Sequence, residues 1–216
     1  MSRFRHLIEK ITNTPNTSNI QIKISAILLQ GSKPIGNVYT NIERNYIKGY
    51  VCPAIHAEVN ALNAYFGKDF RYSDKYGWSI GKKVDKNLNI LVIRKKNDAS
   101  LGNARPCYKC TMMLKNIGVN KVYYSMDDEI YCEKVKDMIS INVSSSWKQI
   151  ETTNYDTIYD YYKSIMDKMP KVIKSINTEL FLQNIMKDIS NCKYKVLNNI
   201  LTIYMCDHII GNITII

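Results

Sequence analysis

Two stretches decide the fold expected of this chain: residues 53–66, PAIHAEVNALNAYF, and residues 106–116, PCYKCTMMLKN. A proline opens each stretch, where its fixed φ angle suits the first turn of a helix and its missing N–H costs little. A glycine follows each one, at Gly67 and Gly118, where a helix commonly ends. We therefore expect helices over about Ala54–Phe66 and Pro106–Asn116.

The segments around these helices predict a sheet. Apolar, β-branched runs typical of strands occupy residues 22–29, 89–93 and 121–125, and turn residues 31–34 lead to a hairpin partner at 35–40. Further helices are expected over 4–11 and 133–139, and connections over 12–18, 41–52, 68–87 and 97–105. The order strand, strand, helix, strand, helix, strand indicates an α/β fold with helices layered on the sheet. Its opening hairpin is antiparallel, and the two crossovers can supply parallel pairs.

The composition changes near residues 144–146, a run of three serines. We place a boundary there, between a first domain, 1–146, and a C-terminal α+β extension, 147–216. In the extension, helices are expected over 155–169, before Pro170, and over 180–190, followed by β structure over 194–216 with turns at 198–199 and 211–212. The role of the extension stays open between an interface, a lid and an added element.

Charge and composition limit the class of protein. The formal net charge of +11 favours anionic partners such as nucleotides or nucleic acid, although scattered lysines also fit a generic basic surface or an AT-rich codon bias. No run approaches the ~20 apolar residues of a membrane-spanning helix, and the N-terminus lacks the apolar core of a signal peptide. We therefore expect a cytoplasmic, intracellular protein with no membrane partner.

The chemistry is concentrated in His56, Glu58, Cys107 and Cys110. Imidazole nitrogen and thiolate sulfur are good ligands of Zn²⁺, and three protein ligands leave the fourth tetrahedral position open, as in catalytic zinc sites. The positive end of a helix that begins near Cys107 would favour the thiolate form of both cysteines. Glu58, two positions after His56, can face a substrate beside the metal without being a ligand. We expect zinc at His56, Cys107 and Cys110, with Glu58 as the catalytic acid and base.

Each feature has a simpler interpretation when it is taken alone. Cys107 and Cys110 could form a redox pair or half of a structural zinc site, and His56 could be an ordinary core histidine. A structural site would need two further ligands, and Cys132, Cys192 and Cys206 are isolated in the sequence. Cys52, four positions before His56, is interpreted as structural. The combination of the four residues favours a catalytic metal site.

The pattern His-x-Glu followed by Pro-Cys-x-x-Cys is the signature of zinc deaminases. The runs Ile55–Leu62, Asn103–Thr111 and Lys121–Ser125 resemble the cytidine and deoxycytidylate (CMP/dCMP-type) deaminase superfamily. The resemblance covers about residues 22–125. It implies a three-layer α/β/α fold with a mixed five-stranded sheet, a zinc cofactor, and often a homo-oligomer. It also implies hydrolysis of a cytosine-type base to the uracil form with release of ammonia.

The resemblance also suggests substrate contacts. An asparagine after the second strand contacts substrate in such enzymes, and Asn41 is the best match here, with Glu43 a weaker one because the spacing to His56 is longer. Ala57, with Ala54 and Ile55, would line the pocket beside the ligand. Arg105 could reach a substrate phosphate or simply cap its loop. The additional His and Cys ligands of an accessory zinc found in some deoxycytidylate deaminases are not recognisable in this sequence.

Three functions are compatible with the sequence. The first is an enzyme of nucleotide metabolism acting on cytidine, deoxycytidine or their monophosphates. The second is an editing enzyme acting on a base in RNA or single-stranded DNA. The basic pair at 82–83, the basic triplet at 94–96 and the 16 tyrosines would suit such a substrate. The third is a non-catalytic protein in which zinc only stabilises the fold, although such a site would not need Glu58.

Overall fold

The computed structural model describes residues 4–15, 19–140, 142–144, 158–167, 171–173, 182, 192–205 and 208–216. It divides the chain into two compact units, Met1–Met138 and Ile139–Ile216. Each unit has its own sheet. The candidate site residues His56, Glu58, Cys107 and Cys110 all belong to the first unit.

A mixed sheet forms the centre of the first unit, as the sequence predicted. Its strands run in the order β10-β9-β7-β1-β2, with the short β8 paired to β7. Their bounds are β1 Ile24–Gln30, β2 Lys33–Thr40, β7 Leu88–Lys95, β8 Leu101–Gly102, β9 Lys121–Met126 and β10 Glu129–Lys134. β1 pairs with β2 and β7 in antiparallel fashion, whereas β7 and β9 are parallel. The second crossover therefore supplies a parallel pair, and the first does not, because β1 lies between β2 and β7.

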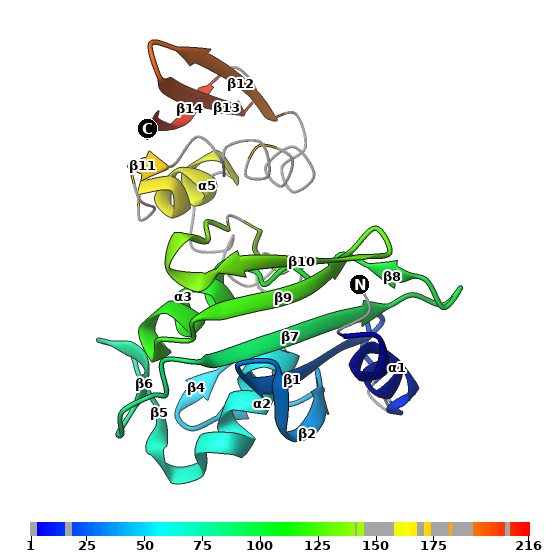
Figure 1. Ribbon diagram of the computed structural model, residues 1–216. Helices are drawn as coiled ribbons and strands as arrows, with labels where there is room; N and C mark the ends of the chain where they lie inside the picture. Colours follow the sequence, from blue (N-terminus) through cyan, green and yellow to red (C-terminus); the bar gives the residue numbers. More distant parts are fainter. Residues whose placement is uncertain are drawn as a thin grey trace. The chain divides into compact units, whose positions relative to one another are not determined.

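Helices cover both faces of this sheet (Figure 1). Helix α1, Arg5–Asn13, buries Leu7 and Ile11 against alternate residues of β1 and β7, including Ile27 and Leu91. Helix α2, Ala57–Phe66, contacts β1 and β2 on the other face. Helix α3, Tyr108–Ile117, lies on the same side as α2, since side chains from the first turns of both helices meet there.

The end of α3 shows why a glycine at position 118 correctly indicated where this helix stops. Gly118 has a φ of 84°, in the left-handed region that favours glycine. Its N–H bonds the carbonyl of Leu114 at 3.1 Å, and the N–H of Val119 bonds the same carbonyl at 3.0 Å. The N–H of Gly118 also lies 3.0 Å from the carbonyl oxygen of Lys115, so the carbonyls of both Leu114 and Lys115 have partners at the end of the helix.

The helix predicted over 133–139 is wrong. Strand β10 covers the first two of these positions, and a 3-10 turn, η3, covers Val135–Asp137. The reason lies in the preceding turn: Asp127 and Asp128 have φ angles of 50° and 64°. Two central residues with positive φ make the kind of two-residue turn that joins antiparallel strands with the correct twist. This turn folds the chain back onto β9 before a helix can begin.

Two small hairpins lie inside the expected connections. One joins β3, Tyr46–Ile47, to β4, Tyr50–Val51. The other joins β5, Phe70–Ser73, to β6, Gly77–Ile80, and follows the 3-10 turn η2, Gly67–Asp69. Strands of two to four residues carry too little periodicity to be recognised in the sequence. Strand β6 packs against α3, so this hairpin contributes to the surroundings of the helix that carries Cys110.

The second unit contains a four-stranded sheet in the order β11-β14-β13-β12. Its elements are α5 Ile158–Asp167, β11 Val172–Ile173, β12 Cys192–Leu197, β13 Ile200–Met205 and β14 His208–Ile215. The expected helix over 155–169 and the β structure over 194–216 are confirmed in the described residues, and the helix expected over 180–190 lies outside them apart from Leu182. Asn198 and Asn199 form the predicted turn with φ angles of 50° and 62°.

The turn predicted at 211–212 is wrong, because both residues lie within β14. Gly211 serves a different purpose: a Cβ atom there would come within 2.8 Å of Cε of Met166 on α5. The missing side chain lets α5 lie close against the sheet. Buried apolar side chains of β13 and β14, including Leu201, Ile203 and Ile213, complete this core.

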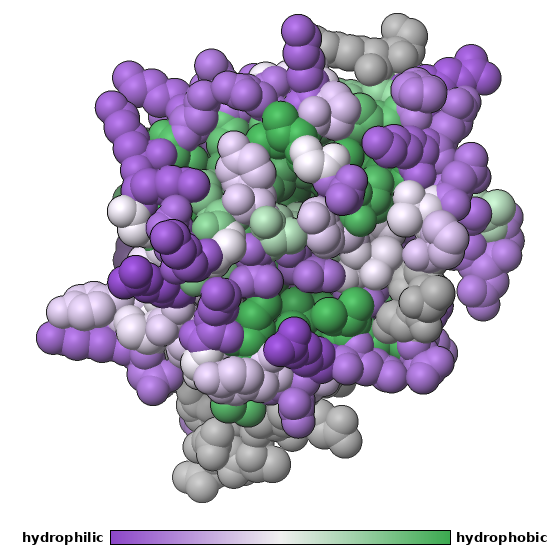
Figure 2. All heavy atoms as spheres, turned by 90° about the horizontal axis from the view of Figure 1, so that it is seen from below, coloured by the Kyte–Doolittle hydropathy of each residue, from purple (hydrophilic) through white to green (hydrophobic). Residues whose placement is uncertain are grey.

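The surface of the chain is mostly hydrophilic on the face shown in Figure 2, where apolar side chains are visible as separate patches among polar ones. Among the described residues, no helix is both long enough and apolar enough to cross a membrane.

Candidate metal centre

The first turns of α2 and α3 bring the four singled-out residues together. His56 and Cys107 are the residues immediately before the helices, with extended backbone, while Glu58 and Cys110 lie in the first turns. The carbonyls of His56 and Cys107 accept the first helical hydrogen bonds, from the N–H groups of Asn60 and Thr111. The backbone of the residue before each helix is therefore held by the helix itself.

The three expected ligands lie close enough together to bind one metal ion. The ligand atoms of His56, Cys107 and Cys110 all lie within 4.8 Å of one another. Nδ1 of His56 is 3.6 Å from Sγ of Cys107 and 3.3 Å from Sγ of Cys110. With Zn–S near 2.3 Å and Zn–N near 2.05 Å, a tetrahedral angle separates sulfur from nitrogen by about 3.6 Å. This group can bind a metal ion, and its donor set fits zinc.

The charges in this group are coupled. The pKa of the Cys107 thiol is lowered because it accepts a hydrogen bond from Cys110 and lies against His56. The pKa of Cys110 is raised, because it donates that hydrogen bond and because it is buried. Burial lowers the pKa of His56, but the adjacent Cys107 outweighs this effect, and the pKa rises to about 9. The site therefore favours one thiolate, and both His56 and Cys110 tend to keep a proton.

Glu58 is buried beside the ligands, with 3% of its surface exposed. Burial raises the pKa of this carboxyl group, while His56 acts in the opposite direction. The hydrogen bond between Glu58 and Cys110 places the carboxyl group next to a thiol ligand. A carboxyl group whose pKa is raised towards neutrality can both accept and donate a proton.

Cys52 is not one of this ligand group. Its thiol is buried and lies 3.7 Å from the carbonyl oxygen of Arg44. The described metal-ligand group contains only His56, Cys107 and Cys110. This arrangement agrees with the structural interpretation of Cys52.

The three expected substrate contacts lie in different surroundings. Ala57 is fully buried at the start of α2, next to the ligand. The side-chain amide of Asn41 joins two backbone groups near the start of β1: its Oδ1 accepts from the N–H of Ile24 at 3.0 Å, and its Nδ2 donates to the carbonyl of Ile22 at 2.7 Å. Arg105 is paired with Glu133. A substrate role for each of them stays a prediction.

An aromatic cluster beside the metal centre was missed in the sequence. The ring of Tyr50 lies 4.6 Å from that of Tyr72 and 5.2 Å from that of Trp78, and Phe70 stacks on Trp78 at 4.3 Å. Burial and the nearby thiols Cys110 and Cys107 raise the pKa of Tyr50, which places this ring near the ligands. These residues come from the two small hairpins, and no pattern in the sequence indicated that the hairpins would meet here.

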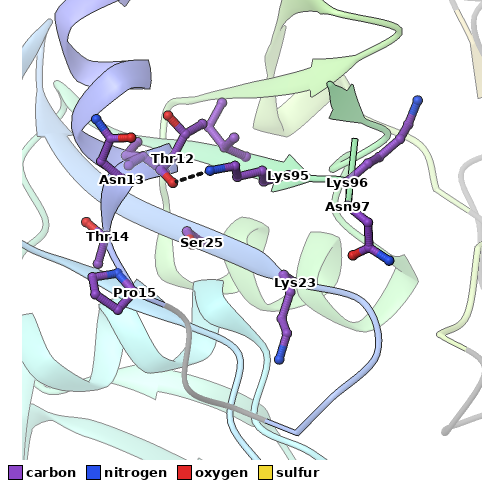
Figure 3. A pocket seen from close by; sticks show the side chains of 11 residues that line it. Thr12, Asn13, Thr14, Pro15, Lys23, Ser25, Lys95, Lys96 and Asn97 are labelled. Carbon is purple, nitrogen blue, oxygen red and sulfur yellow. Dashed lines mark hydrogen bonds between the residues drawn. The ribbon is translucent and has the colours of Figure 1, made fainter. Parts of the chain in front are cut away.

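A separate pocket of about 400 Å³ lies on the α1 face of the sheet (Figure 3). Its lining includes Lys23, Lys95 and Lys96, and none of the described lining residues is acidic. Nζ of Lys95 donates to the carbonyl of Thr12 at 3.1 Å, near the end of α1. A cation at that place stabilises the negative end of a helix. The pocket shares no residue with the metal-ligand group, so it is not part of the candidate centre.

Comparisons with models of protein families, with curated proteins and with solved structures found no match to this chain. The case for a function therefore rests on the geometry of the site and on the motifs that the sequence carries.

Proposed function

We propose that this protein is a zinc-dependent hydrolytic deaminase that converts a cytosine-type nucleoside or nucleotide to the uracil form and releases ammonia. The observation that carries the proposal is the meeting of the ligand atoms of His56, Cys107 and Cys110 within 4.8 Å of one another, with buried Glu58 beside them. A purely structural zinc site uses four protein ligands and needs no such carboxylate. The motif resemblance supplies the reaction class.

The residues have separate roles in this reaction. His56, Cys107 and Cys110 would hold the zinc ion, which when bound lowers the pKa of a water molecule towards neutrality and so makes it a nucleophile. Glu58 accepts the proton of the water that adds to C4 of the pyrimidine ring. It passes this proton to the ring nitrogen, then accepts the proton of the new hydroxyl group on C4 and passes it to the amine, which leaves as ammonia as the C4–N bond breaks and the C4 carbonyl forms.

The aromatic cluster supports a flat substrate. Tyr50 and Tyr72 are only partly buried, and Tyr50 lies near the ligand thiols, so its ring could contact a base held beside the metal. Aromatic rings favour stacking against a heterocyclic base. A homo-oligomeric assembly, which the resemblance implies, belongs to the same proposal.

Release of ammonia by the zinc-loaded protein tests the proposal. The panel holds cytidine, deoxycytidine, their monophosphates, adenosine and a single-stranded oligonucleotide, each offered to wild type, Glu58→Gln and a matched control, Glu9→Gln. The side chain of Glu9 is exposed on helix α1, and the residue is far in sequence from the ligands. Turnover of a small pyrimidine by wild type and the control, with loss in Glu58→Gln, is the expected result. Zinc binding without turnover in any protein would favour the structural function instead.

A base in single-stranded nucleic acid is the second candidate substrate. Exposed tyrosines lie on the two hairpins that carry the aromatic cluster: Tyr46 is 53% exposed and Tyr76 is 69% exposed. Nζ of Lys75 lies 4.9 Å from the ring centre of Tyr76. Aromatic and basic side chains together suit stacking of unpaired bases. Turnover of the oligonucleotide alone would establish this function, and its affinity should fall with added salt.

A further inference from the structure

The loop that leads into Cys107 is fixed by several hydrogen bonds. The N–H of Ala104 donates to the carbonyl of Ser125 on β9 at 2.8 Å. The N–H of Arg105 donates to Oδ1 of Asn103 at 2.9 Å, within the loop itself. These bonds fix the backbone of Ala104 and Arg105. They do not by themselves fix the backbone at Cys107.

The side chain of Arg105 supplies the strongest of these attachments. Its Nε donates to Oε1 of Glu133 at 2.8 Å, and its Nη2 donates to Oε2 at 3.0 Å. This two-point geometry is the most directional that an ion pair can adopt. The hydroxyl of Tyr124 donates to the same Oε1 at 2.6 Å. The Arg105 and Glu133 side chains are only 5% and 14% exposed, so the pair is almost removed from water.

The partners of Arg105 come from two adjacent strands. Tyr124 lies on β9 and Glu133 on β10, and the antiparallel register places them on the same face of the sheet. Burial alone would lower the pKa of Arg105, but the hydrogen bonds and charge of Glu133 raise it. The carboxylate of Glu133 therefore balances the charge of Arg105 and accepts hydrogen bonds from its guanidinium group through both oxygens. If Arg105 moved to a substrate phosphate, a buried carboxylate would be left without its cation, which is costly.

We infer that Arg105, Glu133 and Tyr124 form a positioning unit that holds the Cys107 loop at the spacing the metal requires, and that Arg105 is not a phosphate contact. The inference rests on the proposed metal centre. Arg105 is two residues before Cys107, so a shift of its side chain moves the ligand directly. Groups that orient the ligands of a metal commonly change its affinity 10- to 100-fold when they are removed.

Zinc affinity, measured by competition with a chelator, tests the inference in Glu133→Gln and Arg105→Lys. Glu133→Gln removes the charge and one acceptor of the pair, and Arg105→Lys keeps the positive charge but cannot form the two-point geometry. We expect zinc affinity to fall about 10- to 100-fold in Glu133→Gln and about 10-fold in Arg105→Lys. The exposed pair Arg5–Glu9 offers the matched controls Arg5→Lys and Glu9→Gln, whose affinities should equal that of wild type.

Two further readouts separate positioning from general destabilisation. Circular dichroism shows whether each variant is folded, and the absorbance of the cobalt-substituted protein reports the geometry of the thiolate ligands. Should Glu133→Gln fail to fold, Arg105→Lys carries the test, because its buried charge still has a partner. Wild-type affinity and an unchanged cobalt spectrum in folded Arg105→Lys would overturn the inference.

Turnover completes the experiment. At saturating zinc, the ratio of turnover on a nucleoside to turnover on its monophosphate should be the same in Arg105→Lys as in wild type. A selective loss on the monophosphate would make Arg105 a phosphate contact and overturn the inference. If wild type itself binds no zinc, the proposed function fails and the inference fails with it. If wild type binds zinc and the variants bind it equally well, only the inference fails.

Discussion

Zinc binding should depend steeply on pH, because two of the three ligands start with a proton. Near neutral pH, the lowered pKa of Cys107 favours the thiolate, whereas His56, with a pKa of about 9, and Cys110, with a raised pKa, are protonated. A metal needs the deprotonated form of each ligand. Zinc must therefore displace about two protons, one from His56 and one from Cys110.

The sign and size of the dependence follow from this count. Both raised pKa values lie above neutral pH, so zinc affinity increases as pH rises and decreases as pH falls. Above the lowered pKa of Cys107 and well below the pKa of about 9 of His56, two displaced protons give a change of about 100-fold in the association constant per pH unit, equivalent to about 2.7 kcal/mol. Below the pKa of Cys107, a third proton would add to the slope.

Chelator competition at several pH values measures the slope, and calorimetry in two buffers of different ionisation heat counts the protons released. The control is Cys52→Ser, which removes a buried thiol outside the ligand group and should keep the slope of wild type. A slope near zero would refute the reasoning, since it would mean that all three ligands are already deprotonated. A slope near one would show that either His56 or Cys110 carries no proton at neutral pH.

Three substitutions test the fold that holds the site, each by chemical denaturation. Asn41→Ala removes both hydrogen bonds to the backbone of Ile22 and Ile24 and should lower the free energy of unfolding by about 1–3 kcal/mol; unchanged stability with a raised KM would make Asn41 a substrate contact. Leu62→Ala, at a fully buried position of α2, should cost about 2–5 kcal/mol, and a cost below 1 kcal/mol would contradict its place in the core. Gly118→Ala puts a side chain at a φ of 84° and should cost about 1 kcal/mol; a gain in stability would contradict the left-handed end of α3.

The elements that the sequence predicted are those with a long, uniform pattern. The strand β7 was recognised from its continuous apolar, β-branched run and the helix α3 from the proline before it and the glycine after it, and both are confirmed. The ligand group was also predictable from its motif, and Pro106 lies just before α3 as expected, but α2 begins at Ala57 and not at the predicted Ala54, so His56 precedes the helix. Their meeting within 4.8 Å of one another is what the structure adds.

The parts that escaped prediction depend on partners distant in sequence. Glu133 was expected in a helix, and nothing near it in the sequence indicates that Arg105, 28 residues earlier, would pair with it on a strand. Tyr50 and Trp78 likewise meet only because two short hairpins fold towards each other. Local propensity is a weak guide where tertiary contacts decide the structure.

The two halves of the candidate metal centre are far apart along the chain, since His56 and Cys107 are separated by 51 positions. An ion that joined them would act as a cross-link around a long loop and would restrict the unfolded chain for as long as it stayed bound. For a covalent link closing a loop of this length, the chain-entropy estimate is about 4 kcal/mol at 25 °C. The loop contains α2, the β5–β6 hairpin and β7, and thus the middle of the sheet. A catalytic metal would in this way also affect the folding of the protein. If the chain unfolded with the ion still bound, the two ends of the loop would stay together, and fewer conformations would have to be sampled before the native sheet formed again.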